Sequence, residues 1–256
     1  MDLHSGLPYW IIRNSLWDYF HPLEKDLSTD VVIVGSGITG ALMAHELCHA
    51  GIKCCIVDKR SIATGSSAAS TALLQYEIDV PLCRMAKIIG EENAATAYHA
   101  CLQSISDIKR VLEETGVNAG FEQLPSLFYA SSAADNKLLE QEHEIRQKHK
   151  LPVNLLEKKK IREEYKVKTP GNALINEASA QMDAYRAATG LLAYHIKESG
   201  LKVFTHTSIK ECIETSDGCI MTTDRGHKIK CGYVIIATGF EAGQFLPQKI
   251  MDLTST

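Results

Sequence analysis

The sequence lacks three features that would each point to a particular class of protein: a long apolar run, an excess of positive charge, and paired cysteines. No apolar run approaches the length of a membrane span, so membrane association is not expected. A net charge of -4 gives no indication of the positively charged surface that binds nucleic acid, so no nucleic-acid partner is expected. The eight cysteines are scattered without a C-x-x-C pair, which is typical of reduced thiols in a cytoplasmic protein.

The N-terminus lacks a basic segment followed by a clean apolar core, so no signal peptide is expected. An arm over residues 1–29 is expected to pack on the protein's own surface, with membrane contact as the alternative. The chain of 256 residues, 45% of them hydrophobic, is long enough for one large or two small domains. The arm carries a cluster of aromatic side chains, at Tyr9, Trp10, Trp17, Tyr19 and Phe20.

A glycine-rich segment follows the first buried strand that the sequence predicts. The strand covers residues 31–34, which are all apolar and β-branched. Gly35, Gly37 and Gly40 then have the spacing G-x-G-x-x-G. Gly35 would allow a tight turn, and Gly37 would let the backbone approach a pyrophosphate closely. Gly40 would let the helix pack closely on the strand. The helix is predicted over residues 41–50.

An acidic residue stands at the end of the next predicted strand. Residues 53–57 form a second apolar run, and Asp58 follows it. A carboxylate in that place can accept hydrogen bonds from the ribose hydroxyls of an adenine nucleotide. A strand, a glycine turn, a helix, a strand and an acid in this order predict a dinucleotide site. They do not decide between flavin and nicotinamide nucleotides.

The same helix contains a second signature, H-E-x-x-H, which is that of zinc peptidases. It places His45 and His49 one helical turn apart. Ala41, Ala44 and Cys48 give the helix a small inward face on a different stripe, so both histidines are expected to face solvent. A helix packed flat on a sheet cannot also line an open cleft. No metal site is therefore expected.

A loop rich in hydroxyl groups follows, with the sequence T-G-S-S at residues 64–67. Its small residues could pass close to a ligand while hydroxyl and backbone N–H groups bind phosphate or ribityl oxygens. The alternative is an ordinary serine-capped helix start. In either case a helix is predicted over residues 68–76.

Residues 81–171 predict a second, smaller lobe inserted in the nucleotide domain, because strands alternate there with exposed, charged helices. The expected elements are a helix over 81–115, strands within 121–131, a helix over 133–150, a strand over 153–156 and a helix from 158 onward.

The last third of the chain predicts a meander of short strands. After a strand at 173–176, Asp183 is placed to cap a helix that Gly200 ends. Thr238 and Gly239 follow the final strand. The expected strands lie at 202–205, 208–214, 219–223, 227–230 and 233–237.

Four segments together resemble the flavin-dependent oxidoreductases of the D-amino-acid oxidase type, which include glycine oxidase and sarcosine oxidase. The segments are VVIVGSGITGALMAHELCHAG, VDKR, IATGSSAASTALLQYEID and YVIIATGFEA. The resemblance implies an α/β fold: a Rossmann-like FAD-binding domain with an inserted, partial α+β substrate lobe. It implies FAD rather than NAD as the cofactor. The expected divisions are an arm (1–29), an FAD-binding domain (30–80 and 172–256) and a helical connection with the partial lobe (81–171).

The resemblance also implies which residues meet FAD. The pyrophosphate would lie on Gly35, Ser36, Gly37, Ile38, Thr39 and Gly40. The adenosine ribose would be held by Asp58, with Lys59 and Arg60 beside it. The diphosphate and ribityl chain would be followed by Thr64, Gly65, Ser66, Ser67, Ser70 and Thr71. The adenine end would meet Ile209 and be closed by Ala237, Thr238 and Gly239.

In this family the C–N bond of a small amine or amino acid is oxidised by hydride transfer to flavin, and that activity is the expectation here. Catalytic residues are not assigned: Gln75, Tyr76 and Arg84 are the nearest polar candidates, and packing or surface roles are expected for them. The sequence ends at Thr256, before the segment with which family members usually return over the flavin ring. Weak or absent FAD binding, and no turnover of amines, are therefore expected. A non-catalytic fragment and a nicotinamide-dependent oxidoreductase are the alternatives, and the oligomeric state is not predicted.

Overall fold

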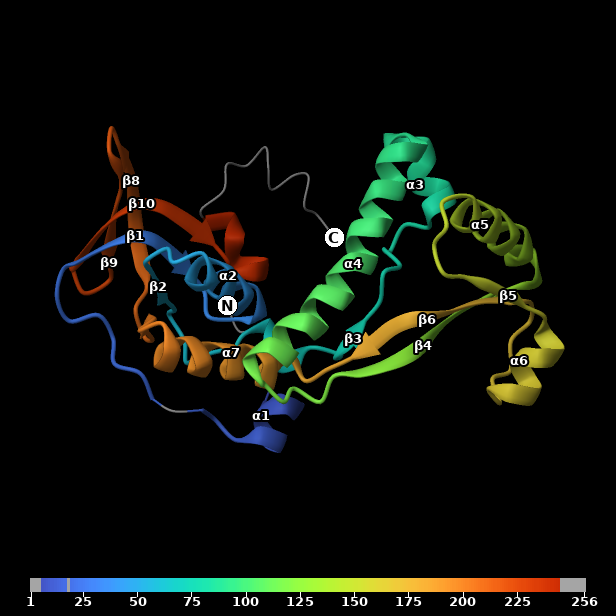
Figure 1. Cartoon of the computed structure of the whole chain (residues 1–256), viewed down its shortest axis with the longest axis horizontal. Coiled ribbons are helices and arrows are strands. Elements are labelled where there is room, and N and C mark those ends of the chain that lie inside the picture. The colour runs from blue at the N-terminus through green and yellow to red at the C-terminus, as the bar shows by residue number, and fades with distance from the viewer. Residues whose placement is uncertain (1–5, 18, 245–256) are drawn as a thin grey trace. The chain divides into compact units, whose positions relative to one another are not determined.

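The structure is a computed structural model, and it describes residues 6–17 and 19–244 (Figure 1). The described chain forms two compact units. The first unit contains the residues up to Thr71, the short segment Thr115–Ala119 and the residues from Asp183 onward. The second unit contains Ala72–Glu114 and Gly120–Met182.

The first unit is built on a six-stranded sheet with the strand order β7-β2-β1-β10-β9-β8. The first four strands in this order run parallel, and β9 and β8 continue the sheet as an antiparallel meander. This arrangement confirms the predicted α/β class. The strands are β1 (Leu27–Val34), β2 (Cys54–Val57), β7 (Lys202–Phe204), β8 (Ile209–Thr215), β9 (Gly218–Thr223) and β10 (Lys228–Ile236).

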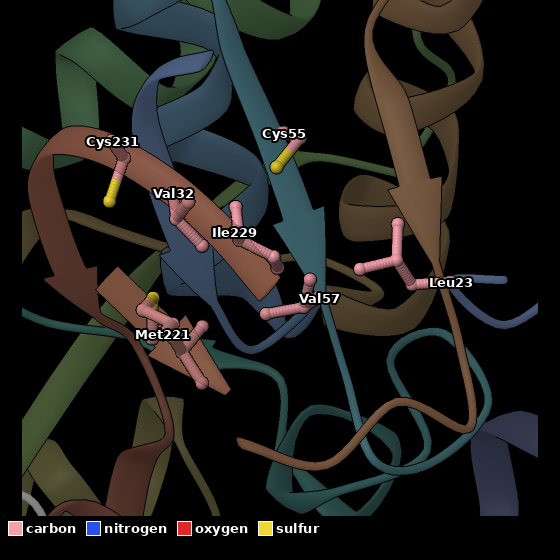
Figure 2. Packing of buried hydrophobic residues seen from close by; sticks show 8 residues of the cluster. Leu23, Val32, Cys55, Val57, Met221, Ile229 and Cys231 are labelled. Atoms are coloured by element: carbon pink, nitrogen blue, oxygen red, sulfur yellow. The ribbon is translucent and has the colours of Figure 1, made fainter. Parts of the chain in front are cut away.

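One core cluster of this unit lies on one face of that sheet. Val32 of β1, Val57 of β2 and Ile229 of β10 are fully buried and come from three neighbouring parallel strands. Figure 2 shows them gathered with Met221 of the meander and with Leu23, which lies before β1. The β-branched run that predicted a strand therefore supplies the buried end of β1.

Helices α2 (Ile38–His49) and α7 (Ala184–Glu198) pack against each other in the same unit. Ala41 and Ala44 are fully buried, so the small face predicted for α2 is turned inward. Asp183 caps α7 as predicted, because its side chain accepts a hydrogen bond from the backbone N–H of Arg186. The unit also contains α1 (Tyr9–Asn14) and the short 3-10 helices η1 (Ser66–Ala69) and η3 (Gly239–Gln244).

The second unit has a small antiparallel sheet with the order β3-β6-β4. The strand β5 also pairs with β6, at the end of β6 away from β3. Its strands are β3 (Leu73–Leu74), β4 (Glu122–Tyr129), β5 (Asn154–Leu156) and β6 (Ala173–Gln181). Its helices are α3 (Leu82–Ile89), α4 (Glu91–Thr115), η2 (Ala133–Asp135), α5 (Asn136–Lys148) and α6 (Lys158–Glu164).

Four predictions of secondary structure were wrong. The strands within 121–131, expected to be interrupted at Pro125, are one strand, β4, whose pairing with β6 shifts register between Leu124 and Ser126. Residues 68–76 are not helical, because the chain leaves η1 in an extended conformation at Ser70 and enters β3. The helix over 81–115 is two helices, broken where Gly90 has a φ of 87°. The strands at 227–230 and 233–237 are one strand, β10, which pairs with β9 through its first half and with β1 along almost its whole length.

Candidate functional site

A pocket of about 540 Å³ opens at one edge of the parallel sheet in the first unit. Its walls include Val34 and Val57, the last residues of β1 and β2, and Ala237, which follows β10. Parallel strands present their carboxyl ends at one edge, and this is where open α/β sheets bind ligands. The fold thus brings together segments that are far apart in the sequence.

The glycine turn forms one wall of this pocket. Gly35 has a φ of 111°, and a side chain there would collide with the backbone carbonyl of Ala237. A side chain at Gly40 would collide with the carbonyl of Gly35. At Gly37, by contrast, the nearest atom to an added Cβ is the Ser67 hydroxyl, 3.0 Å away. Gly35 and Gly40 are therefore required by the fold, while Gly37 leaves space beside a pocket wall.

The carboxylate of Asp58 is fixed at the rim of the pocket. Its Oδ2 accepts hydrogen bonds from the backbone N–H and the hydroxyl of Ser36, at 2.7 and 2.6 Å. Its Oδ1 accepts one from the backbone N–H of Arg60, at 2.8 Å. Each carboxylate oxygen has two acceptor positions. Among the described residues a single donor reaches Oδ1, which leaves one position for a ligand hydroxyl.

The hydroxyl-rich loop lies against the glycine turn and also lines the pocket. Ser67 is buried, and its hydroxyl accepts a hydrogen bond from the backbone N–H of Ile38 in the first turn of α2, at 2.9 Å. The helix N-terminus and the loop are therefore held together. Free N–H groups at a helix N-terminus favour an anionic ligand.

Lys59 and Arg60 do not point freely into the pocket, because both bind Glu241 of η3. The Lys59 ammonium lies 2.8 Å from a Glu241 oxygen, and the Arg60 guanidinium lies 2.7 Å from the other. The Arg60 hydrogen bond, with the further contribution of Lys59, lowers the pKa of the Glu241 carboxyl to about 2. Glu241 was not singled out from the sequence, since nothing local predicts that η3 folds back onto the end of β2.

Of all the residues predicted to meet FAD, only Ser36, Gly40 and Thr64 do not line the pocket. Ser36 and Gly40 lie behind the pocket wall, and the Thr64 hydroxyl donates to the carbonyl of Ser61. The sequence missed eight further lining residues, which are mostly apolar or belong to loops brought in by the sheet. They are Val34, Val57, Ala63, Ala69, Ala184, Thr207, Ser208 and Glu241.

Thr238 provides an independent indication of a ligand. Its hydroxyl oxygen is buried, its residue lines the pocket, and it has no hydrogen-bond partner among the described residues. A buried hydroxyl without a partner costs about 1–3 kcal/mol, so such groups are normally satisfied. A polar ligand in the pocket would satisfy it.

Of the two histidines of α2 that were predicted to face solvent, the prediction is confirmed for His49 and wrong for His45. His49 is exposed, but His45 is only 4% exposed and its Nδ1 lies 3.0 Å from Nε2 of the buried His195 on α7. His45 of α2 thus faces α7. Among the described residues, no cluster of three or more histidine, cysteine or acidic side chains could hold a metal ion.

The three polar residues considered near the substrate lie in the second unit. Tyr76 is fully buried, and its hydroxyl donates to the carbonyl of Pro152 at 2.7 Å. Burial raises the pKa of Tyr76 to about 12. Gln75 and Arg84 are exposed. Packing and surface roles were predicted for these residues, and their positions agree with that.

Comparison with known proteins decides which cofactor such a pocket serves. The family model for FAD dependent oxidoreductases matches residues 30–254. The chain belongs to this family. FAD is therefore its cofactor, rather than the nicotinamide nucleotide that remained as an alternative.

The chain spans about half the length of the proteins to which it is similar. A Bacillus subtilis protein named as a Rieske 2Fe-2S iron-sulfur protein, YhfW, is 23% identical over 91% of this chain and 44% of its own length. Glycine oxidase from Geobacillus kaustophilus has the same fold, with a TM-score of 0.69, 22% identity and 83% and 56% of the two chains covered. An L-amino acid deaminase from Proteus vulgaris also has this fold, with a TM-score of 0.73 and 17% identity. The match covers 97% of this chain and 61% of the deaminase chain.

The described part of the chain has no helix that is both long and apolar enough to cross a membrane. The cytoplasmic location remains a prediction.

Proposed function

We propose that the pocket of the first unit holds FAD and that the protein oxidises the C–N bond of a small amine or amino acid. The observation that carries this proposal is that one pocket contains both a fixed carboxylate, Asp58, beside the glycine turn and a buried hydroxyl, Thr238, that has no partner among the described residues. The names of two proteins with the same fold, a glycine oxidase and an L-amino acid deaminase, favour an amino-acid substrate. When bound, FAD accepts the hydride that leaves the substrate.

Each part of the chain then has a distinct role toward FAD. Asp58 binds the adenosine ribose through Oδ1, because Oδ2 is occupied by Ser36. Gly37 lets the pyrophosphate approach the first turn of α2. The first unit is the FAD-binding domain, and the second unit contributes to the substrate lobe. No residue is assigned to the hydride step.

The cofactor part is tested by adding FAD or NADH to the purified chain and measuring binding by fluorescence. We expect FAD to bind in a one-to-one complex that Asp58→Ala weakens, and NADH not to bind. FAD binding that is equally tight in a folded Asp58→Ala protein would remove this pocket from the proposal. Binding of NADH in preference to FAD would contradict it altogether.

The substrate part is tested by anaerobic mixing of the FAD complex with a panel of amino acids and secondary amines. Loss of the flavin absorption band with one of them would support the proposal and would overturn the expectation from the sequence that the chain does not turn over amines. Retention of the band with every member would favour the alternative of a non-catalytic FAD-binding fragment. Because YhfW is named as an iron-sulfur protein, reoxidation should be compared between oxygen and a one-electron acceptor such as ferricyanide.

A further inference from the structure

The described part of the N-terminal arm, residues 7–17 and 19–23, has one face on the rest of the first unit and one face in solvent. Ile11 is buried and Trp10 is partly buried, whereas Tyr9, Ile12 and Leu16 are each more than 60% exposed. The buried side chains therefore belong to a specific contact rather than to a loosely adhering segment. What the arm contacts decides its role.

The arm forms hydrogen bonds with three segments that also form the pocket walls. The indole N–H of Trp10 donates to the backbone carbonyl of Ser70 at 2.9 Å. Asn14 donates to Oδ2 of Asp183 at 2.6 Å, and Asp183 caps α7 immediately before the pocket residue Ala184. The arm therefore forms hydrogen bonds with both the hydroxyl-rich loop and the residue that caps α7.

The third contact is at the end of the arm. The backbone N–H of Leu23 donates to the hydroxyl of Thr207 at 3.0 Å, and Leu23 is 2% exposed. Thr207 lines the pocket, and its own backbone N–H donates to the carbonyl of Asp58 at 2.9 Å. The arm is therefore connected through one residue to the backbone of the ribose-binding position.

The Trp10 contact has a directional consequence for the pocket. All peptide bonds among the described residues are trans, and the C=O and N–H of a trans peptide point in opposite directions. With the Ser70 carbonyl bound to the arm, the N–H of Thr71 points away from the arm. Ser70 and Thr71 both line the pocket, and the Thr71 N–H has no acceptor within the described residues.

We propose that the arm is a positioning element of the FAD site and that Trp10 orients the Ser70–Thr71 peptide so that the Thr71 N–H can donate to bound FAD. The proposal rests on the proposed function for the identity of the ligand. It does not make Trp10 a catalytic residue, because Trp10 acts through the backbone of the loop. Oxygen atoms of the diphosphate and ribityl chain are the acceptors of matching chemistry.

The test compares the only two tryptophans of the chain, Trp10 and Trp17. Trp10→Phe keeps an aromatic ring and removes the N–H donor. Trp17→Phe is the matched control, because the Trp17 ring contacts Phe20 and forms no hydrogen bond among the described residues. Two quantities are measured on the full chain: amide hydrogen exchange of residues 61–72 without FAD, and the dissociation constant for FAD.

In Trp10→Phe we expect faster exchange of the 61–72 segment, unchanged exchange of β1 and β2, and FAD binding weakened roughly threefold to tenfold, the loss of one hydrogen bond. Trp17→Phe should change both quantities by less than about twofold. Unchanged exchange of the 61–72 segment in Trp10→Phe would overturn the positioning role, and faster exchange with unchanged FAD affinity would overturn its connection to the cofactor. If the wild-type chain does not bind FAD at all, the proposed function fails too, while the exchange result still decides whether Trp10 orders the loop.

Discussion

At the scale of single residues, Gly37 and Gly40 differ although both belong to one sequence motif. An added methyl group at Gly40 collides with a backbone carbonyl, whereas at Gly37 it meets only the Ser67 hydroxyl, 3.0 Å away. We expect Gly40→Ala to lower the melting temperature severely or to prevent folding. Gly37→Ala should lower the melting temperature much less than Gly40→Ala does, because only the Ser67 hydroxyl must shift. It should weaken FAD binding at least about tenfold, because the methyl group occupies space near the pyrophosphate.

Thermal unfolding and an FAD titration measure the two effects separately. Gly232→Ala offers a control, since Gly232 also has no positive φ, an added Cβ there would lie 3.3 Å from the carbonyl of Asp30, and the residue is outside the pocket. If Gly37→Ala binds FAD as tightly as the wild type, the pyrophosphate does not approach the turn at this glycine.

Asp58 is bound by three donors of the protein itself, so its replacement affects both the pocket and the fold. Asp58→Ala should weaken FAD binding by about 1.5–3 kcal/mol, the value of a hydrogen bond to a charged group. Ser36→Ala removes one donor to Oδ2 and leaves Oδ1 untouched. It should therefore weaken FAD binding less than Asp58→Ala does. Equal losses of affinity would mean that Oδ1 is not the oxygen that meets the ribose.

The sequence could predict these residues because the glycine turn and Asp58 depend on local geometry that one strand, one turn and one helix define. Glu241 and Thr207 could not be found in this way. Each reaches the pocket through the pairing of distant strands: Glu241 lies beyond β10, and Thr207 lies between β7 and β8. Their positions depend on sheet order, which no local pattern contains.

At the scale of elements, the contact between α2 and α7 contains a pair of facing histidines. Nδ1 of His45 and Nε2 of His195 are 3.0 Å apart, and Nδ1 of His195 lies 3.0 Å from the Ser199 hydroxyl. Burial lowers the pKa of His195, and positive charge on His45 or His49 lowers it further. A proton shared between the two rings is compatible with this geometry, whereas two full positive charges are not.

The pair predicts a specific pH dependence of stability. Because the pKa of His195 is lower in the folded than in the unfolded protein, the unfolded state binds more protons below about pH 6.5. The free energy of unfolding should therefore fall as the pH drops below about 6.5, by at most about 1.4 kcal/mol per pH unit for this group. Urea unfolding at several pH values measures it.

His195→Gln is the matched variant, since glutamine retains a donor and an acceptor but does not titrate. It should be less stable than the wild type at pH 8 and show a shallower loss of stability below about pH 6.5. An unchanged slope would assign the acid sensitivity to other groups. The sequence pattern placed His45 on the solvent side because a helix covered on one face by a sheet was expected, and the second helix was not considered.

At the scale of the whole molecule, the second unit has its own buried charge network. Arg146 is 1% exposed, its guanidinium lies over the rings of Tyr76 and Tyr98, and its Nε donates to Glu142 at 2.7 Å. The same carboxylate accepts from the first backbone N–H groups of α3. This network therefore joins α5, α3 and α4 within that unit.

Arg146→Met should destabilise the second unit by about 3–5 kcal/mol, because it leaves the Glu142 carboxylate buried without its partner. Arg110→Met is the control in the same unit: Arg110 is exposed, its contacts to Asp107 and Glu114 are 3.4 Å long, and its loss should cost less than about 1 kcal/mol. Amide hydrogen exchange reports on the two units separately. Equal loss of protection in β1 and in β6 would show that the chain unfolds as one unit.

The fold class could be predicted because buried strands of β-branched residues alternate with helices along the chain. The joining of two predicted strands into β10 could not, since Gly232 interrupts the apolar pattern and glycine is disfavoured inside a strand. In the structure Gly232 is tolerated because β1 lies alongside: a side chain at Gly232 would sit 3.3 Å from the carbonyl of Asp30. Sheet partners, rather than local preference, keep this strand continuous.

The pairing of β1 with β10 also has a consequence for folding during protein synthesis. β1 is one of the first strands to leave the ribosome, and its partner β10 is among the last of the described ones: Lys228 bonds to Asp26 from 202 positions away. At about 5–20 residues per second, β1 waits on the order of 10–40 s for that partner. Throughout this time one edge of an apolar strand is open to other nascent chains, so the yield of folded protein in the cell should depend on chaperones more than its final stability would suggest.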